Sequence, residues 1–220
     1  MTEPRDLIDA IRRVNRAARI ADLDDADFAT EIAELSALAD RLDDVGVDDV
    51  RMQAGLRHDE LMQRFAANLT GGEDRVNRAL DIGVGGFFPY SPYIGALNPM
   101  AAPVEFETVA VDGGAELHAT HTFHPIVNGP PGGVHGGVIA GVFDELLGSV
   151  CVVNDVSGFT GTLTIRYSSL TPLEQPITMR GWVDRVEGRK TFARGTFHQG
   201  DTLTAEAEGI FIGPADGERS

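Results

Sequence analysis

Residues 129–148 read GPPGGVHGGVIAGVFDELLG, and this stretch decides how the rest of the chain is interpreted. Its proline and glycine residues predict a rigid loop that ends at His135-Gly136-Gly137. The apolar run that follows predicts a buried helix that continues to about Val150. Asp144 stands among the apolar residues of this run and is followed by Glu145. Carboxylates are rarely buried without a partner or a purpose, so Asp144 is the first candidate for chemistry.

The sequence around this helix has the two-residue alternation of β-strands. Five strands are predicted, over residues 115–123, 161–167, 177–186, 191–198 and 202–212. A single helix among mainly antiparallel strands indicates an α+β fold, in which the sheet wraps the apolar helix.

The first part of the chain has a helical pattern instead. Apolar residues recur at helical spacing over residues 7–18 and 28–42, and a third short helix is predicted over residues 57–69. Asp24 or Asp25 could cap the second helix. The sequence Thr70-Gly71-Gly72 is typical of a helix stop. We therefore predict an N-terminal helical extension (residues 1–72) followed by an α+β domain (residues 76–214).

Composition and charge limit the partners and the location. Of the 220 residues, 42% are hydrophobic, which suffices for a core, and no apolar stretch predicts a membrane span or a secretory signal. The net charge of −16 opposes binding to nucleic acid and to anionic membranes. Cys151 is the only cysteine, which excludes an intrachain disulfide and a thiolate metal cluster and is typical of a cytoplasmic protein.

An anionic ligand would therefore need a local positive patch. Lys190 is the only lysine and follows Arg189 in the sequence EGRK, which also suits an ordinary charged hairpin turn. A second basic run, with Arg12, Arg13, Arg16 and Arg19, lies in an acidic region and is interpreted as a solvated or paired helix face.

The start of the apolar helix and Asp144 together suggest chemistry on a carbonyl group. Free N–H groups at a helix start stabilise a developing oxyanion, and glycine at position 136 would let the ligand approach the backbone. A carboxylate acts as a nucleophile or as a base. Close helix packing by Gly136 and Gly137, and an exposed or ion-paired Asp144, are the structural alternatives.

The spacing of these two groups predicts a dimer. Gly136 and Asp144 are eight residues apart, which is about 12 Å along a helix. They cannot meet on one carbonyl within one helix. If both act on the same group, Asp144 comes from a second, antiparallel copy, and a two-fold homodimer supplies it.

Other chemical signals are interpreted as structural. His118, His121 and His124 fall on a strand, where side chains alternate, so His121 points away from the other two. Residues 83–86, GVGG, precede no helix, and Asp22, Asp24 and Asp27 lack the glycine and glutamate of a calcium loop. No GxSxG elbow is present, and Cys151 is predicted to be a buried apolar residue.

The sequence resembles the hotdog-fold acyl-CoA thioesterases, and within them the PaaI-type branch that includes the THEM-type enzymes. The resemblance rests on GPPGGV and HGGVIAGVFDELLG, and on RYSSLTP, VDRVEGRKTF and SPYIGALNPMAAP further along the chain. It covers roughly residues 80–213 and leaves the N-terminal helices out. It implies a hotdog fold, an antiparallel sheet wrapped around a central helix, for the α+β domain.

The resemblance also implies roles for individual residues. Gly136 would donate its N–H to the thioester oxygen, His135 would shape that loop, and the partner's Asp144 would be the nucleophile or general base. Thr160 matches the family's hydroxyl residue that positions water or the aspartate. The substrate-binding residues would be Gly137 and Asn128, with Arg189 and Lys190 on the phosphates of coenzyme A. Some relatives have asparagine where this chain has Gly129, so Asn128 is displaced by one position.

The resulting hypothesis is a hotdog-fold acyl-CoA thioesterase that hydrolyses a thioester to a free acid and coenzyme A. It would act as a homodimer or dimer of dimers, without a metal or a bound cofactor and without nucleic acid. Two alternatives remain: a non-catalytic acyl-CoA sensor or carrier with the same fold, and a DNA-binding regulator with the N-terminal helices as reader. The acidic bias of those helices opposes the second. The length of the acyl group is left open.

Overall fold

The computed structural model describes residues 3–24, 27–46, 88–100, 103–156 and 158–213. Its helices and strands, in chain order, are α1 (Pro4–Ile20), α2 (Ala29–Asp43), β1 (Glu107–Val111), β2 (Gly114–Thr122), the short 3-10 helix η1 (Pro125–Val127), α6 (Gly136–Val153), β3 (Phe159–Tyr167), β4 (Pro176–Glu187), β5 (Lys190–Gln199) and β6 (Thr202–Ile212). The predicted helix over 57–69, the glycine stop after it and the domain boundary lie outside the described residues.

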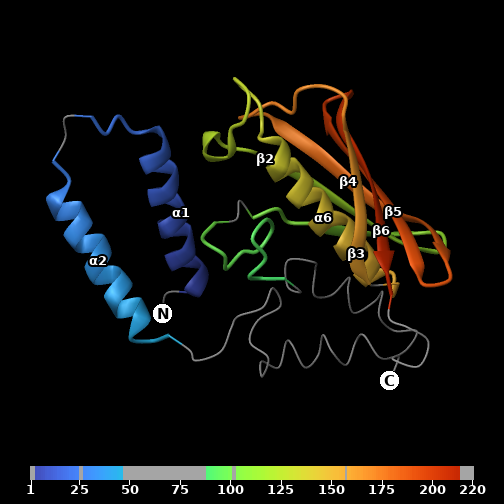
Figure 1. Cartoon of the computed structure of the whole chain (residues 1–220), viewed down its shortest axis with the longest axis horizontal. Coiled ribbons are helices and arrows are strands. Elements are labelled where there is room, and N and C mark those ends of the chain that lie inside the picture. Colours follow the sequence, from blue (N-terminus) through green and yellow to red (C-terminus); the bar gives the residue numbers. More distant parts are fainter. Residues whose placement is uncertain (1–2, 25–26, 47–87, 101–102, 157, 214–220) are drawn as a thin grey trace.

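The strands form one antiparallel sheet in the order β1-β2-β4-β5-β6-β3, and α6 lies across one face of it (Figure 1). The register shifts between Thr160 and Thr162 and between Val183 and Arg185, and such irregularities increase the local bend and twist of a sheet. The predicted α+β hotdog fold, with a helical N-terminal region, is confirmed. The strand β1 is an addition to the five predicted strands.

Small residues in the middle strands allow α6 to approach the sheet closely. An added Cβ at Gly181 would lie 2.8 Å from Leu146, and one at Gly209 would lie 3.1 Å from Leu147. Phe143 of α6 stacks on Phe197 of β5 with ring centroids 3.9 Å apart. The apolar side of α6 and the glycine-lined face of the sheet therefore form the core.

By length and composition alone, α6 is the one helix among the described residues that could cross a membrane. In the structure half of it is buried, and its large apolar residues belong to the core cluster. Its hydropathy is that of a core helix enclosed by a sheet.

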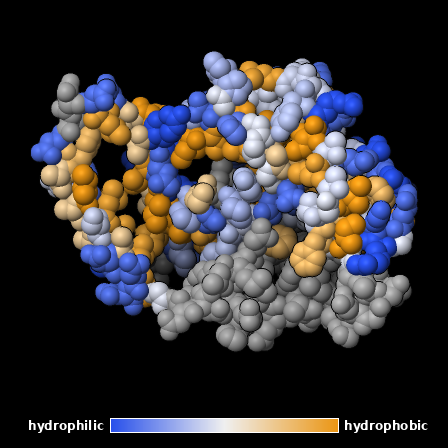
Figure 2. Space-filling view, in the orientation of Figure 1, coloured by the Kyte–Doolittle hydropathy of each residue, from blue (hydrophilic) through white to orange (hydrophobic). Residues whose placement is uncertain are grey.

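The helix α1 lies against the domain, and α2 lies beyond it (Figure 1). None of the described residues of α1 and α2 is buried, and Figure 2 shows apolar residues on the surface of this helical region. The cap prediction for α2 is wrong for Asp24, because the helix begins later, at Ala29. There the Asp27 carboxylate accepts the Ala29 N–H at 3.0 Å. Asp25 lies outside the described residues.

Candidate active site

The start of α6 is organised by His135. As the N-cap residue, His135 accepts the Gly137 N–H with its Nδ1 at 3.0 Å, and its carbonyl oxygen accepts the Val138 N–H at 2.9 Å. Among the described residues, Gly136 is the one member of this first turn whose N–H has no such acceptor. The predicted oxyanion donor, Gly136, is thus open, whereas the N–H of Gly137 is occupied by the cap.

A tight loop holds His135 in place. The His135 N–H donates to the Val127 carbonyl at 2.9 Å, and Asn128 forms an antiparallel bridge with Val134. An added Cβ at Gly129 would lie 2.7 Å from the His135 Cα, so this position requires glycine for close backbone approach. The loop therefore places Asn128 beside the residues that lead into α6.

Asp144 lies on the half-exposed face of α6, two turns after Gly136. The Thr160 Oγ1 donates a hydrogen bond to Asp144 Oδ1 at 2.9 Å. The contact forms because β3 follows α6 and runs back along it, which brings the start of the strand to the middle of the helix. The structure thus brings together two predicted site residues that are sixteen positions apart in the sequence.

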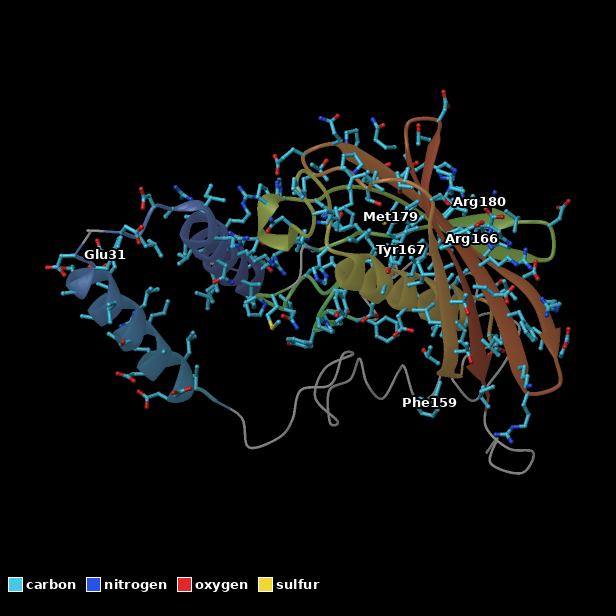
Figure 3. All side chains as sticks on the ribbon, turned by 45° about the horizontal axis from the view of Figure 1, so that its top comes forward. Glu31, Phe159, Arg166, Tyr167, Met179 and Arg180 are labelled. Carbon is cyan, nitrogen blue, oxygen red and sulfur yellow. The ribbon has the colours of Figure 1, made fainter. Side chains whose placement is uncertain are left out.

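The other end of β3 meets the start of α6. Phe159 and Tyr167 are the first and last residues of this strand (Figure 3). The Tyr167 hydroxyl donates to the Gly136 carbonyl oxygen at 2.8 Å. Tyr167 was not among the predicted site residues. The antiparallel return of β3 along α6 is the signal that could have found it.

The face of α6 that carries Asp144 is lined by small residues. They are Gly137, Ala140, Gly141 and Gly148. The Tyr93 ring lies directly on Gly141, where an added Cβ would overlap it. Ser91 is buried nearby and donates to the Glu145 carboxylate at 2.7 Å. The segment 88–100 therefore borders the Asp144 face, and it carries Tyr93, whose aromatic ring the sequence offers either as acyl-tunnel lining or as plain core.

The predicted basic pair lies in the turn between β4 and β5. Gly188 has a φ of 58° at the first turn position, which glycine adopts readily. Arg189 donates through Nε and Nη2 to the Gly213 carbonyl, at 3.1 and 3.0 Å, and Lys190 is exposed. Ile212 pairs with both Lys190 and Phe159, so the basic turn lies at the same end of the sheet as Thr160.

The remaining candidates have structural surroundings. His118 contacts Glu116, and His124 contacts Glu174, each at 2.9 Å. Burial lowers the pKa of His121 to about 4, and it raises the pKa of the Cys151 thiol to about 12, so both are uncharged near neutral pH. Within the described ranges, no cluster of three histidine, cysteine or acidic side chains could hold a metal ion.

Comparisons with known proteins point to one family. Residues 131–207 match the model of the thioesterase superfamily. The chain is 35% identical to the acyl-coenzyme A thioesterase THEM4 of Mus musculus over 88 residues, and 31% identical to THEM5 of Homo sapiens over 88 residues. Each match covers 39% of this chain, and 38% and 36% of those proteins, so the chain spans about two fifths of the curated relatives it matches.

A solved structure matches over a much longer part of the chain. It is the crystal structure of a thioesterase superfamily protein, with a TM-score of 0.75 and 27% sequence identity, and the match covers 96% of this chain and 91% of the other. Together these comparisons confirm the resemblance to thioesterases and the fold class. They leave the roles of the individual site residues as predictions.

Proposed function

We propose that this chain, whose residues 131–207 match the thioesterase superfamily, hydrolyses acyl-CoA to a free carboxylic acid and coenzyme A. The observation that carries the proposal is the Asp144 carboxylate on the open face of α6, with one oxygen held by Thr160. The relatives named above are acyl-coenzyme A thioesterases, which supports the substrate class.

In the proposed reaction the Gly136 N–H binds the thioester carbonyl oxygen and stabilises the negative charge that develops on it. Thr160 occupies Asp144 Oδ1, so Oδ2 is left to act. It either takes a proton from a water molecule that attacks the carbonyl carbon or attacks that carbon itself. The C–S bond then breaks. In the first route the free acid forms directly, and the proton that Asp144 took from water passes to the coenzyme A thiolate. In the second route the acyl group is left as an anhydride on Asp144, and a water molecule hydrolyses it to release the acid, restore the carboxylate and supply the thiolate's proton. The chemistry uses no metal and no bound cofactor.

The site needs two copies of the chain. Gly136 and Asp144 are about 12 Å apart along α6, so a carbonyl at Gly136 requires the partner's Asp144. The strand β3 lies at the edge of the sheet, and its residues are largely exposed. Pairing of two β3 edges about a two-fold axis would bring the two α6 helices side by side and antiparallel, which supports a homodimer with two equivalent sites.

Coenzyme A needs a positive surface on a chain with a net charge of −16. Lys190 and Arg189 supply two cations at the end of the sheet where Thr160 lies. We assign the phosphates to this turn, since guanidinium and ammonium groups bind phosphate well.

The test is release of thiol from a panel of acyl-CoA substrates by the wild type and by Asp144→Ala. The expected loss in kcat is about 10²-fold, the size of a general-base contribution. Single turnover in ¹⁸O-labelled water separates the two roles of Asp144, because only a nucleophilic carboxylate acquires label. Acyl-CoA binding without hydrolysis by the wild type would contradict the proposal and favour the non-catalytic acyl-CoA-binding alternative.

A further inference from the structure

Three arginines of α1 reach across to the domain. Arg5, Arg12 and Arg19 are spaced by seven residues, which is close to two helical turns, and so share one face of α1. Arg5 contacts Glu105 at 2.9 Å, Arg12 contacts the segment 95–98, and Arg19 contacts Asn128. Arg13 and Arg16 are exposed on the same helix, and no contact to the domain is found for them among the described residues.

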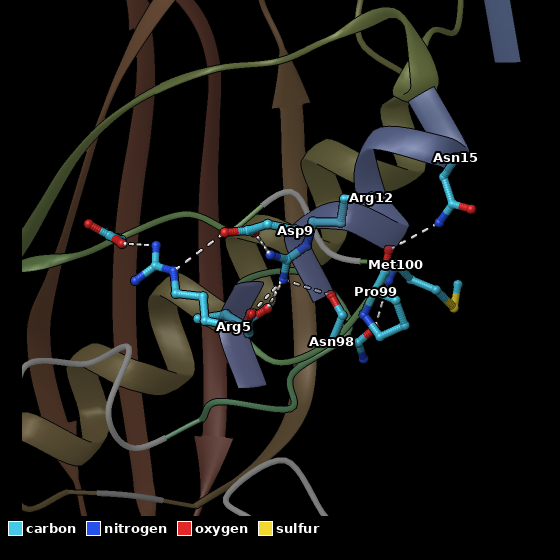
Figure 4. Close-up of polar contacts among 10 residues, drawn as sticks. Arg5, Asp9, Arg12, Asn15, Asn98, Pro99 and Met100 are labelled. Carbon is cyan, nitrogen blue, oxygen red and sulfur yellow. Dashed lines mark hydrogen bonds and ion pairs between the residues drawn. The ribbon is translucent and has the colours of Figure 1, made fainter. Parts of the chain in front are cut away.

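Arg12 fixes the position of α1. Its Nη2 lies within 2.8 to 2.9 Å of the carbonyl oxygens of Gly95, Ala96 and Asn98, and its Nη1 pairs with Asp9 at 2.6 Å (Figure 4). The Arg12 side chain is only 12% exposed, which sets it apart from ordinary surface pairs. This anchor holds the following two turns of α1 beside the loop that leads to α6.

Arg19 then meets the candidate active site directly. Its Nη2 donates to Asn128 Oδ1 at 2.6 Å. Because a guanidinium has only donors, the contact fixes the orientation of the amide: Oδ1 faces Arg19 and the two Nδ2 hydrogens face elsewhere. A charged donor on the amide oxygen also polarises the amide, which strengthens the Nδ2 hydrogens as donors. The backbone of Asn128 pairs with that of Val134, two residues before Gly136, so this amide is carried by the loop segment that leads to the open N–H.

We infer that Arg19 is a positioning residue, through which the N-terminal helix orients the Asn128 amide as a second donor for the substrate carbonyl. The inference rests on the proposed function and adds to it a role for the N-terminal extension. It also gives Asn128 a role in the site. This residue is displaced by one position from the asparagine of some relatives, and its contact with Arg19 would set the orientation of its amide.

The kinetic test is a double-mutant cycle on the full chain. Arg19→Ala is expected to lower kcat about tenfold with little change in KM, and Asn128→Ala to lower it about 10²-fold. The double variant should lose no more than Asn128→Ala alone, because Arg19 acts through Asn128. Arg19→Lys, which keeps a donor, should retain more activity than Arg19→Ala. Arg16→Ala makes the same charge change on the same helix and should match the wild type.

Additive losses in the double variant, or an equal loss in Arg16→Ala, would overturn the role of Arg19. A second measurement does not depend on hydrolysis. With asparagine-selective ¹⁵N labelling, the Asn128 side-chain signals are those that vanish in Asn128→Ala. They should shift in Arg19→Ala and stay in place in Arg16→Ala. If they do not move in Arg19→Ala, the inference is wrong even when the enzyme is active. If they move but no acyl-CoA is hydrolysed, the proposed function fails and the contact stands.

Discussion

Thr160 Oγ1 donates a hydrogen bond of 2.9 Å to Asp144 Oδ1, so a residue at the start of the edge strand β3 holds one oxygen of a half-exposed carboxylate. The hydroxyl engages Oδ1 and fixes the rotation of the carboxylate about its Cβ–Cγ bond. The other oxygen then points in a defined direction, as an acyl-transfer site requires. The contact forms where the chain returns from α6 into β3, and pairing of Thr160 with Phe211 of β6 holds this part of the strand in the sheet.

Replacement of Thr160 tests this contact. Thr160→Val has nearly the same shape but no hydroxyl, so Asp144 loses its donor and becomes free to rotate. We expect kcat to fall about tenfold, in the range of one misaligned catalytic group. Thr160→Ser keeps the hydroxyl and should remain close to the wild type. Steady-state hydrolysis of acyl-CoA measures both, and equal rates for Thr160→Val and wild type would refute a positioning role.

The packing of Tyr93 on Gly141 predicts that the effect of Gly141→Ala on the free energy of unfolding depends on whether the Tyr93 ring is present. An added Cβ at 141 overlaps the ring, so Gly141→Ala should destabilise the fold by about 1 to 3 kcal/mol. With Tyr93→Ala in the background the overlap is gone, and the same change should become neutral or stabilising by up to about 1 kcal/mol, from the better helix propensity of alanine.

The matched control is Gly148→Ala on the same face. There the added Cβ would lie 3.6 Å from the Phe211 ring, an ordinary contact, so a small stabilisation is expected. Urea unfolding of the four variants and the wild type gives the free energies. A loss at Gly141 that persists without the Tyr93 ring would show that the ring is not its cause.

The ion pair between Glu116 and Arg180 predicts a pH dependence of stability. Arg180 donates through Nη2 and Nε at 2.6 and 2.7 Å, and these hydrogen bonds, opposed by burial, lower the pKa of Glu116 to about 2 from its ordinary 4.5. The folded state therefore holds the carboxylate charged over a range where the unfolded chain is protonated. The stabilisation is fully present above about pH 4.5 and is lost as the pH falls toward 2.

Comparison with Glu116→Gln isolates this effect. The wild type should have the larger free energy of unfolding near neutral pH, and the difference should shrink as denaturant curves are repeated at successively lower pH. The variant keeps the shape of the side chain and removes the titration. If the difference in free energy of unfolding between the wild type and Glu116→Gln stays constant as the pH falls, protonation of Glu116 does not affect the stability of the fold.

Much of the domain was predictable because its signals are local. The apolar run after His135 gives α6, and period-two alternation gives five of the strands within a few residues of their observed bounds. The strand β1 was missed because it is only five residues long, lies at an edge and shows no clear alternation of burial. The tight turn at Gly113, whose φ is 85°, joins β1 to its antiparallel partner β2 and was the local signal for this strand.

The candidate site was only partly predictable, and the reason is sequence separation. The spacing along one helix and the family resemblance lead to Gly136, Asp144 and Thr160. The contact of Arg19 with Asn128 joins residues 109 positions apart, and that of Ser91 with Glu145 joins residues 54 apart. No periodicity within one element encodes such pairs, since they depend on how α1 and the segment 88–100 pack on the domain.

The proposed two-copy site predicts complementation between inactive variants. Gly136→Pro removes the open N–H and suits the local backbone: proline is favoured at the first helical position, and His135 before it is already extended, with ψ of 130°. The nearest atom to an added Cβ at 136 is the Tyr167 hydroxyl oxygen, at an ordinary 3.5 Å. Asp144→Asn removes the acid with little change of shape. Each homodimer should be nearly inactive and still folded, which thermal unfolding verifies.

Co-refolding equal amounts of the two variants should restore activity. Half of the dimers are then mixed, and each mixed dimer has one site that combines an intact Gly136 from one copy with an intact Asp144 from the other. The expected rate is therefore about a quarter of the wild-type rate, since one of two sites works in half of the dimers. If both groups acted within one chain, every site would contain one defect and no activity would return. The outcome thus depends on which subunit supplies the carboxylate, and inactivity of the mixture despite proven subunit exchange would exclude the shared site.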